Sequence, residues 1–151
     1  MKHIHGDIWP YYGEMGHIVC LTTNGFVKSN GEAVMGRGNA LQATQRIPGI
    51  ELLLGVYIKT HDNVAGLMRT SADEMDGVFI FPVKHNWWER ADLDLIETSA
   101  QILHSYAIGA SDHIFHLPRP GVGNGSRDWE TEVKPILERV GLPDNVEVHY
   151  L

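Results

Sequence analysis

The sequence contains a single cysteine, Cys20, which lies inside an apolar segment. A disulfide within the chain is therefore impossible, and we expect Cys20 to be a small buried side chain in a cytoplasmic protein. No apolar run approaches the ~20 residues that a membrane-spanning helix needs. The N-terminal residues MKHIHGDIW also lack the apolar stretch of a secretion signal. These absences predict a protein with no membrane partner.

Basic residues are scarce relative to acidic ones. The chain has 12 Lys and Arg against 19 Asp and Glu, which gives a formal net charge of −7. A broad, salt-dependent surface for nucleic acid needs concentrated positive charge, so this balance argues against one. It leaves room for a small anionic ligand, because backbone amides can bind phosphate on an acidic protein.

The nine histidines suggest a metal site at first sight. However, His3-x-His5 and His113-x-x-His116 fall in strand-like segments that contain no Cys or acidic partner at zinc-site spacing, and no His-Glu-x-x-His motif is present. We interpret these histidines as surface or core side chains, and expect neither a metal nor a cofactor.

Apolar runs predict a series of strands. Five of them lie at the start of 2–9 and within 17–23, 77–83, 113–118 and 146–151. Two further runs, 55–60 and 64–70, are separated by the turn-like residues HDN and predict a β-hairpin.

Helical patterns alternate with these strands. A first helix has Ala40, Leu41, Thr44 and Ile47 on one face and is expected to end at Pro48. A second helix starts after Asp92, a good N-cap, and runs to Gly109, a plausible residue just past the helix end. A third helix surrounds 129–137, where Pro135 is expected to delay its start or kink it. This alternation predicts an α/β fold with a mixed sheet and helices on both faces.

Two glycine-rich segments follow predicted strands. They are TTNGFVKSNGEAVMGRGNA (22–40) and PRPGVGNGSRDW (118–129). In such folds ligands bind beyond the carboxyl ends of the strands, where loops lead into helices. Glycines allow close approach of backbone amides, and a helix N-terminus adds partial positive charge, so the pair suits a diphosphate.

Simpler nucleotide motifs fail in the first segment. Leu41 stands where the third glycine of a dinucleotide motif belongs, and Arg37 and Gly38 stand where a P-loop needs Lys and Ser or Thr. Either loop alone is explained by tight turns between packed elements. Two such loops after different strands favour an anion-binding site.

Together GDIW (6–9) and these two loops resemble a macro domain, and more narrowly the short ADP-ribose-1″-phosphate-processing macro proteins of phages and bacteria. The similarity extends over nearly the whole chain, including FPVKHNWW (81–88) and EVKPIL (132–137). It implies one domain over residues 1–151, a three-layer α/β/α sandwich with a mixed, mostly parallel sheet, and a cleft for ADP-ribose. A monomer is expected.

The resemblance also assigns site residues. Asp7 would accept a hydrogen bond from the adenine amino group beside the Ile8 amide, although a short acid after a strand is also a common turn residue. Asn24 and Asn30 would lie near the distal ribose, although both stand in Asn-Gly turns. The diphosphate and distal ribose would be held by two walls, consisting of Thr23, Met35, Gly36, Arg37 and Gly38 and of Pro118, Gly121, Val122, Gly123, Asn124 and Gly125.

The chemistry follows less directly from the residues. Asn30 and Asp128 are the candidate catalytic residues; Asp128 could orient or deprotonate water, or simply cap the last helix. Some relatives use a lysine shortly after the first loop, but this chain has Gln45 and Arg46 there, and arginine cannot serve as that nucleophile. Lys84 could reach a ligand phosphate or only end a strand.

The family's common Asn-Ala-Asn is replaced by Thr-Thr-Asn-Gly at 22–25. We favour a hydrolase that acts at C1″ of the distal ribose, on ADP-ribose-1″-phosphate or on an ADP-ribosylated protein or nucleic acid. The alternatives are a non-catalytic ADP-ribose or nucleotide-signal binder and, disfavoured by the failed motifs, another nucleotide-phosphate enzyme on a similar sheet.

Overall fold

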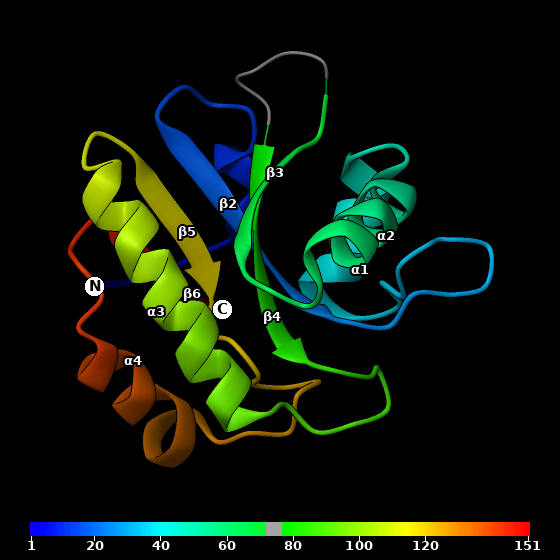
Figure 1. Ribbon diagram of the computed structural model, residues 1–151. Coiled ribbons are helices and arrows are strands. Elements are labelled where there is room, and N and C mark those ends of the chain that lie inside the picture. Colours follow the sequence, from blue (N-terminus) through cyan, green and yellow to red (C-terminus); the bar gives the residue numbers. More distant parts are fainter. Residues whose placement is uncertain (72–76) are drawn as a thin grey trace.

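The computed structural model describes residues 1–71 and 77–151 and is built around a six-stranded sheet. The strand order is β1-β6-β5-β2-β4-β3 (Figure 1). Neighbouring strands are parallel except β3, which runs antiparallel to β4 at the edge. The strands are β1 (Lys2–His5), β2 (His17–Asn24), β3 (Gly66–Arg69), β4 (Gly77–Lys84), β5 (Ile114–Pro118) and β6 (Val146–Tyr150).

Helices cover both faces of this sheet, which confirms the predicted three-layer sandwich. Helices α3 (Leu93–Gly109) and α4 (Lys134–Val140) lie on one face, and α1 (Gly38–Arg46) and α2 (Ile50–His61) lie on the other (Figure 1). A short 3₁₀ turn, η1 (Trp9–Tyr11), joins the α1–α2 layer, and a π-helical turn, η2 (Trp129–Val133), leads into α4. None of the described helices is long and apolar enough to cross a membrane.

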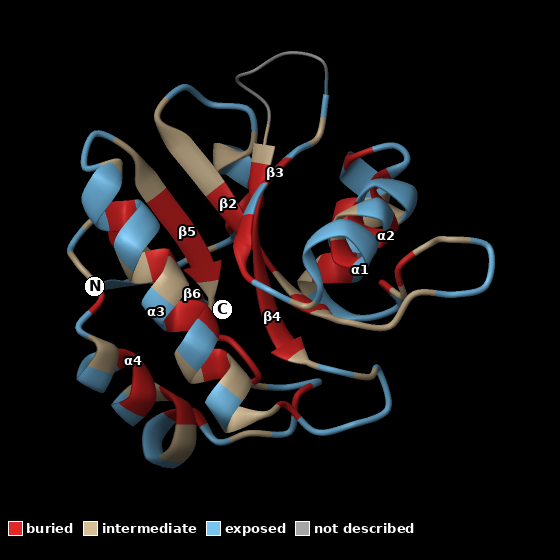
Figure 2. Ribbon diagram, viewed as in Figure 1, coloured by how far each residue is buried: buried red, intermediate tan, exposed pale blue. Residues whose placement is uncertain are grey.

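The central strands are apolar without interruption because both of their faces are covered. Residues Val78 to Val83 of β4 are all buried (Figure 2). Phe79 and Phe81 pack toward α3, whereas Val78 and Ile80 pack toward α2. The strand therefore contributes to two separate cores and holds the layers together.

The predicted hairpin at 55–70 is wrong in its first half. Residues 55–60 belong to α2, and β3 pairs with β4 instead. The apolar run from Gly55 is too short to separate strand from helix, but Ile50, Leu54 and Ile58 are buried at helical spacing. Gly55 also lies against the Gly31 carbonyl, where a larger side chain would collide.

The ends of the other helices lie close to the positions predicted from the sequence. Helix α1 ends before Pro48, but its buried side chains are Ala40 and Ala43, and Leu41 is exposed. Helix α3 includes Gly109 as its last residue instead of placing it beyond the end. Pro135 sits in the first turn of α4, after the π-helical turn, so the expected delay is confirmed.

Asp92 is the N-cap of α3, as expected: its Oδ1 accepts hydrogen bonds from the backbone N–H groups of Asp94 (2.9 Å) and Leu95 (3.3 Å). Replacing Asp92 with alanine should lower the free energy of unfolding by about 1 kcal/mol. Asp92→Asn retains an acceptor and is the matched control, with a much smaller loss. Denaturant unfolding at pH 7 measures both, and equal losses would contradict a capping role.

The charge of Asp92 adds a pH dependence. Partial burial raises the pKa of Asp92, but hydrogen bonds from the Leu95 and Asp94 backbones and from His85 outweigh it, so the pKa lies below its ordinary value. A carboxyl group whose pKa is lower in the folded state stabilises the protein at pH values above its unfolded-state pKa. This contribution is lost as the pH falls through the folded-state pKa. The difference between wild type and Asp92→Asn should therefore shrink below about pH 4.

Candidate functional site

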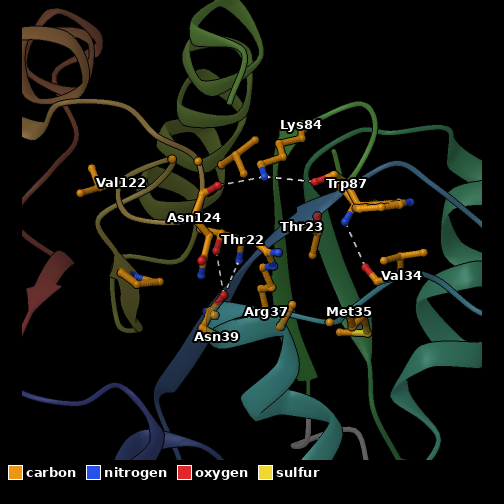
Figure 3. A pocket seen from close by; sticks show the side chains of 18 of the residues that line it. Thr22, Thr23, Val34, Met35, Arg37, Asn39, Lys84, Trp87, Val122 and Asn124 are labelled. Atoms are coloured by element: carbon orange, nitrogen blue, oxygen red, sulfur yellow. Dashed lines mark hydrogen bonds between the residues drawn. The ribbon is translucent and has the colours of Figure 1, made fainter. Parts of the chain in front are cut away.

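A cavity of about 520 Å³ opens at the carboxyl ends of β2, β4 and β5 (Figure 3). It lies between the two glycine-rich loops, in the position that parallel α/β sheets use for ligands. Its lining comes from four segments: Thr22, Thr23 and Asn24; Val34 to Ala40; Val83, Lys84 and Trp87; and Pro118, Arg119, Gly121, Val122, Asn124 and Gly125.

Most of the residues assigned to the two walls meet around this cavity. They are Thr23, Asn24, Met35, Gly36, Arg37, Gly38, Pro118, Gly121, Val122, Asn124 and Gly125. Asp7, Ile8 and Gly123 are not among its lining residues, nor are the candidate catalytic residues Asn30 and Asp128. The ligand roles of all these residues stay predictions.

The charged side chains that line the cavity all carry positive charge. They are Arg37, Lys84 and Arg119, and the described lining includes no carboxylate, histidine or cysteine. On a chain with a net charge of −7 this is a local reversal of sign. The donor set offers nothing that a metal ion prefers, and it suits an anion.

Asn39 fixes the first wall to the sheet (Figure 3). Its Oδ1 accepts hydrogen bonds from Thr22 N (3.0 Å) and Thr22 Oγ1 (2.7 Å), and its Nδ2 donates to the Cys20 carbonyl oxygen (3.0 Å). The first turn of α1 is thereby held against the end of β2. Sequence reasoning did not assign Asn39, although it directly follows Gly36, Arg37 and Gly38.

The Asn24 side chain forms hydrogen bonds within the same loop. Its Nδ2 donates to the Val34 carbonyl oxygen (3.0 Å), and its Oδ1 accepts from Phe26 N (3.0 Å). Asn30 lies in the exposed part of the loop, where its carboxamide bonds to the Glu32 carboxylate (2.7 Å) and backbone N–H (3.0 Å). The structure thus gives both asparagines turn contacts, the alternative considered from the sequence.

The second wall is held by backbone geometry. Gly121 has φ +74°, and a Cβ at Gly125 would collide with the Gly121 carbonyl, so the loop folds tightly on itself. Arg127 Nε donates to the Ala91 carbonyl oxygen (2.7 Å), and Ala91 N donates to the Gly125 carbonyl oxygen (2.9 Å). These bonds fasten the loop to the segment that precedes α3.

Lys84, the last residue of β4, joins the segment after β4 to the second wall. Its Nζ donates to the carbonyl oxygens of Asn124 (3.1 Å) and Trp87 (3.4 Å), as Figure 3 shows. Burial and, second, the neighbouring Arg37 guanidinium lower the pKa of Lys84 below its ordinary value. Lys84 ends β4 and lines the cavity, so the structure fits both roles considered for it from the sequence, and its contact with a phosphate stays a prediction.

Two lining groups have no hydrogen-bond partner. Thr23 Oγ1 and Arg119 Nε are buried atoms without one. The Arg119 guanidinium is stacked between the rings of Trp129 (4.5 Å) and Tyr150 (4.6 Å). A buried polar atom without a partner is costly, and both atoms belong to residues that line the cavity. Arg119 lay within the second loop but was not singled out.

The aromatic side chain of Trp87, next in the chain to Trp88, lies at the cavity. Trp87 lines it and is half exposed, and the exposed ring of Trp88 packs edge-to-face against Phe26 (5.6 Å). The motif FPVKHNWW contained both tryptophans, but nothing in it placed Trp87 at the cavity.

The remaining assigned residues have local structural contacts. Asp7 Oδ1 accepts from Trp9 N (3.2 Å), and Ile8 is buried in the core beneath α1 and α2. Asp128 caps η2, where its Oδ2 accepts from Thr131 Oγ1 (2.7 Å) and N (2.8 Å), and these bonds lower its pKa. Asp128 therefore has the capping contacts considered as its alternative role.

Comparisons with solved structures identify the fold. No protein-family model and no curated protein sequence matches the chain. The macrodomain of Mycobacterium tuberculosis DarG superposes with a TM-score of 0.76 at 24% identity, over 99% of this chain and 97% of that one. The macrodomain of Thermus aquaticus DarG gives a TM-score of 0.72 at 22% identity, over 98% and 95%. The chain therefore has the macrodomain fold, as the resemblance of its loops implied.

A third structure is Thermosipho africanus DarTG in complex with ADP-ribose. It gives a TM-score of 0.76 at 17% identity, over 99% of this chain but 41% of the longer DarTG chain. The superposition thus covers nearly the full length of this chain and less than half of the DarTG chain.

The Asn39 contacts generate a stability prediction. Asn39→Asp replaces the Nδ2 donor with an acceptor facing the Cys20 carbonyl oxygen, and the free energy of unfolding should fall by about 2 kcal/mol. Gln45→Glu makes the same chemical change at an exposed position of α1 and serves as the control. Denaturant unfolding at pH 7 compares the two. Equal stabilities would contradict the anchoring role of Asn39.

Proposed function

We propose that this protein binds ADP-ribose in the cavity between the two glycine-rich loops. The observation that carries the proposal is the lining itself: three cationic side chains, two walls of close backbone and, among the residues that the structure describes, no carboxylate. A diphosphate needs such a setting, because backbone amides and cations compensate its charge. The similarity to a DarTG structure solved with ADP-ribose supports the choice of ligand.

The arrangement of the walls suggests an orientation. The diphosphate lies against Gly36, Arg37 and Gly38, at the N-terminus of α1, and against the loop from Gly121 to Gly125. The distal ribose then reaches Thr23, whose hydroxyl lacks a partner. The adenine extends toward Asp7 and Ile8, the residues that the family resemblance assigns to it. Neither residue is part of the cavity lining.

We further propose that the protein is a hydrolase acting at C1″ of the distal ribose. Its substrate is ADP-ribose-1″-phosphate or an ADP-ribosyl group on a protein or nucleic acid. Asn30 and Asp128 are bonded elsewhere, so Lys84 replaces them in the proposal as the ionisable group of the cavity. Its lowered pKa makes proton transfer near neutral pH easier than for an ordinary lysine.

The proposed step uses Lys84 as a general acid. As the C1″–O bond breaks, the Lys84 ammonium donates a proton to the leaving oxygen, and a water molecule adds to C1″. The proton released by this water returns to Lys84, and the products are ADP-ribose and the freed acceptor. The walls contribute orientation and charge stabilisation.

A non-catalytic ADP-ribose binder is the second candidate. It is favoured by one observation, the lack of a carboxylate or histidine among the described lining residues that could activate water. Incubation with ADP-ribose-1″-phosphate, ADP-ribosylated protein and ADP-ribosylated DNA separates the two. Released ADP-ribose supports the hydrolase, whereas binding without turnover on all three substrates supports the binder.

Binding is tested with a pair of glycine substitutions. A Cβ at Gly36 meets nothing within 4 Å, so Gly36→Glu adds a carboxylate to the wall without a clash at that atom. Repulsion of the diphosphate should weaken ADP-ribose binding by at least about 100-fold in isothermal titration calorimetry. Gly109→Glu makes the same change at the end of α3, also in open space, and should bind as wild type does. Equal affinities would refute the placement of the ligand.

Catalysis is tested at Lys84. Lys84→Arg keeps a cation and hydrogen-bond donors but cannot release a proton, so turnover should fall by about 10²- to 10⁴-fold. ADP-ribose affinity should change little, whereas Lys84→Met should lose both turnover and part of the affinity. Single-turnover release of ADP-ribose is the measurement. Full activity in Lys84→Arg would eliminate the general-acid role and leave the binding proposal intact.

A further inference from the structure

A row of three imidazoles crosses the sheet away from the cavity. His17 at the start of β2, His116 in β5 and His149 in β6 lie on the face covered by η1. His17 Nδ1 is 2.9 Å from His116 Nε2, and His116 Nδ1 is 2.9 Å from His149 Nε2. The Tyr11 ring is stacked on His116, with centroids 3.9 Å apart. His116 and His149 are buried.

A backbone carbonyl sets the direction of this row. His149 Nδ1 is 3.1 Å from the Gly6 carbonyl oxygen, which can only accept, so this nitrogen carries a hydrogen. The lone pair of the neutral His149 ring is therefore on Nε2 and faces His116 Nδ1. His116 Nδ1–H can then donate to His149 Nε2, and His116 Nε2 can accept from His17 Nδ1–H.

Glu147 completes the cluster. It lies two residues before His149 on the same face of β6 and is paired in register with His116 of β5. Its carboxylate is half buried and makes no hydrogen bond or ion pair with any residue that the structure describes. One ligand atom from each of His116, Glu147 and His149 lies within 4.8 Å of the others. Two imidazoles and a carboxylate at this separation suit a cation.

We propose that His116, Glu147 and His149 form a binding site for one divalent transition-metal ion of the Zn²⁺ class. The ligand atoms are His116 Nδ1, His149 Nε2 and a Glu147 carboxylate oxygen, a combination that zinc and related ions accept. The site shares no residue with the cavity. It was hidden in the sequence because its ligands come from two strands, and His113, which suggested a metal motif, is not among them.

The groups around the cluster fit this assignment. Ligating histidines commonly donate their other ring N–H to a fixed acceptor. His149 Nδ1–H already has the Gly6 carbonyl, and His116 Nε2–H would have His17 Nδ1. The metal would replace the hydrogen between His116 Nδ1 and His149 Nε2. The distance between these two nitrogens would then increase from 2.9 Å to about 3.3 Å. The ion would thereby tie β5 to β6.

The first test measures binding and stability of the full chain after treatment with a chelator. Zn²⁺ should bind with a stoichiometry of one and raise Tm by about 5 °C or more at a hundredfold excess over Kd. Glu147→Gln, which is nearly isosteric, should weaken Zn²⁺ binding at least about tenfold. Glu138→Gln and His104→Gln are the controls, at positions outside the cluster, and should bind Zn²⁺ as wild type does. Equal Zn²⁺ affinity of Glu147→Gln and the controls would overturn the proposal.

The second test reads the tautomer of His116 by ¹⁵N NMR of the imidazole rings. Without metal, the row directed by the Gly6 carbonyl should place the His116 hydrogen on Nδ1. With Zn²⁺, His116 should carry its hydrogen on Nε2, and the Nδ1 signal should move to the position of a metal-bound nitrogen. An unchanged His116 tautomer at saturating Zn²⁺ would show a hydrogen-bonded row without a metal site. Neither test depends on ADP-ribose binding, so a negative result in either test leaves the proposed function unaffected.

Discussion

The side chain of Asn39 ties the first turn of α1 to the end of β2 through hydrogen bonds to Thr22 and Cys20, and the shape of the cavity depends on this contact. A strand end and a helix N-terminus otherwise leave backbone groups without partners. Here one carboxamide pairs with groups of β2 and fixes where the glycines of the first wall can stand. A ligand meets a wall that is already in place, and the entropy of ordering that wall is not lost on binding.

Electrostatics adds a second constraint. The cavity gathers Arg37, Lys84 and Arg119 on a chain whose overall charge is negative. Long-range attraction of an anion is therefore weak, and the local arrangement of cations and amides has to provide selectivity. Such an arrangement distinguishes a compact diphosphate from an extended polyanion such as nucleic acid, which needs a basic surface.

Features set by local sequence could be predicted. The glycine-rich loops, the buried strands and the Asp92 cap depend on neighbouring residues, and the order of the elements brings the loops to one edge of the sheet. Helix α2 was missed because its apolar run was read from Gly55, whereas its period begins at Ile50. The contacts of Asn39, Arg119 and Lys84 join segments far apart in the chain, so their spacing carried no signal. Asn30 and Asp128 were chosen for their chemistry, but their local turn and capping bonds engage them outside the cavity.

The contact that joins the segment after β4 to the second wall has an evolutionary consequence. Lys84 binds the carbonyl oxygens of Asn124 and Trp87, not their side chains. Because every residue type offers the same carbonyl, the side chains at these two rim positions can change without removing the bridge. The Lys84 hydrogen bonds can thus be retained while the side chains at positions 87 and 124 change. Substitutions at these two positions alone could then alter which group attached to a ligand is preferred.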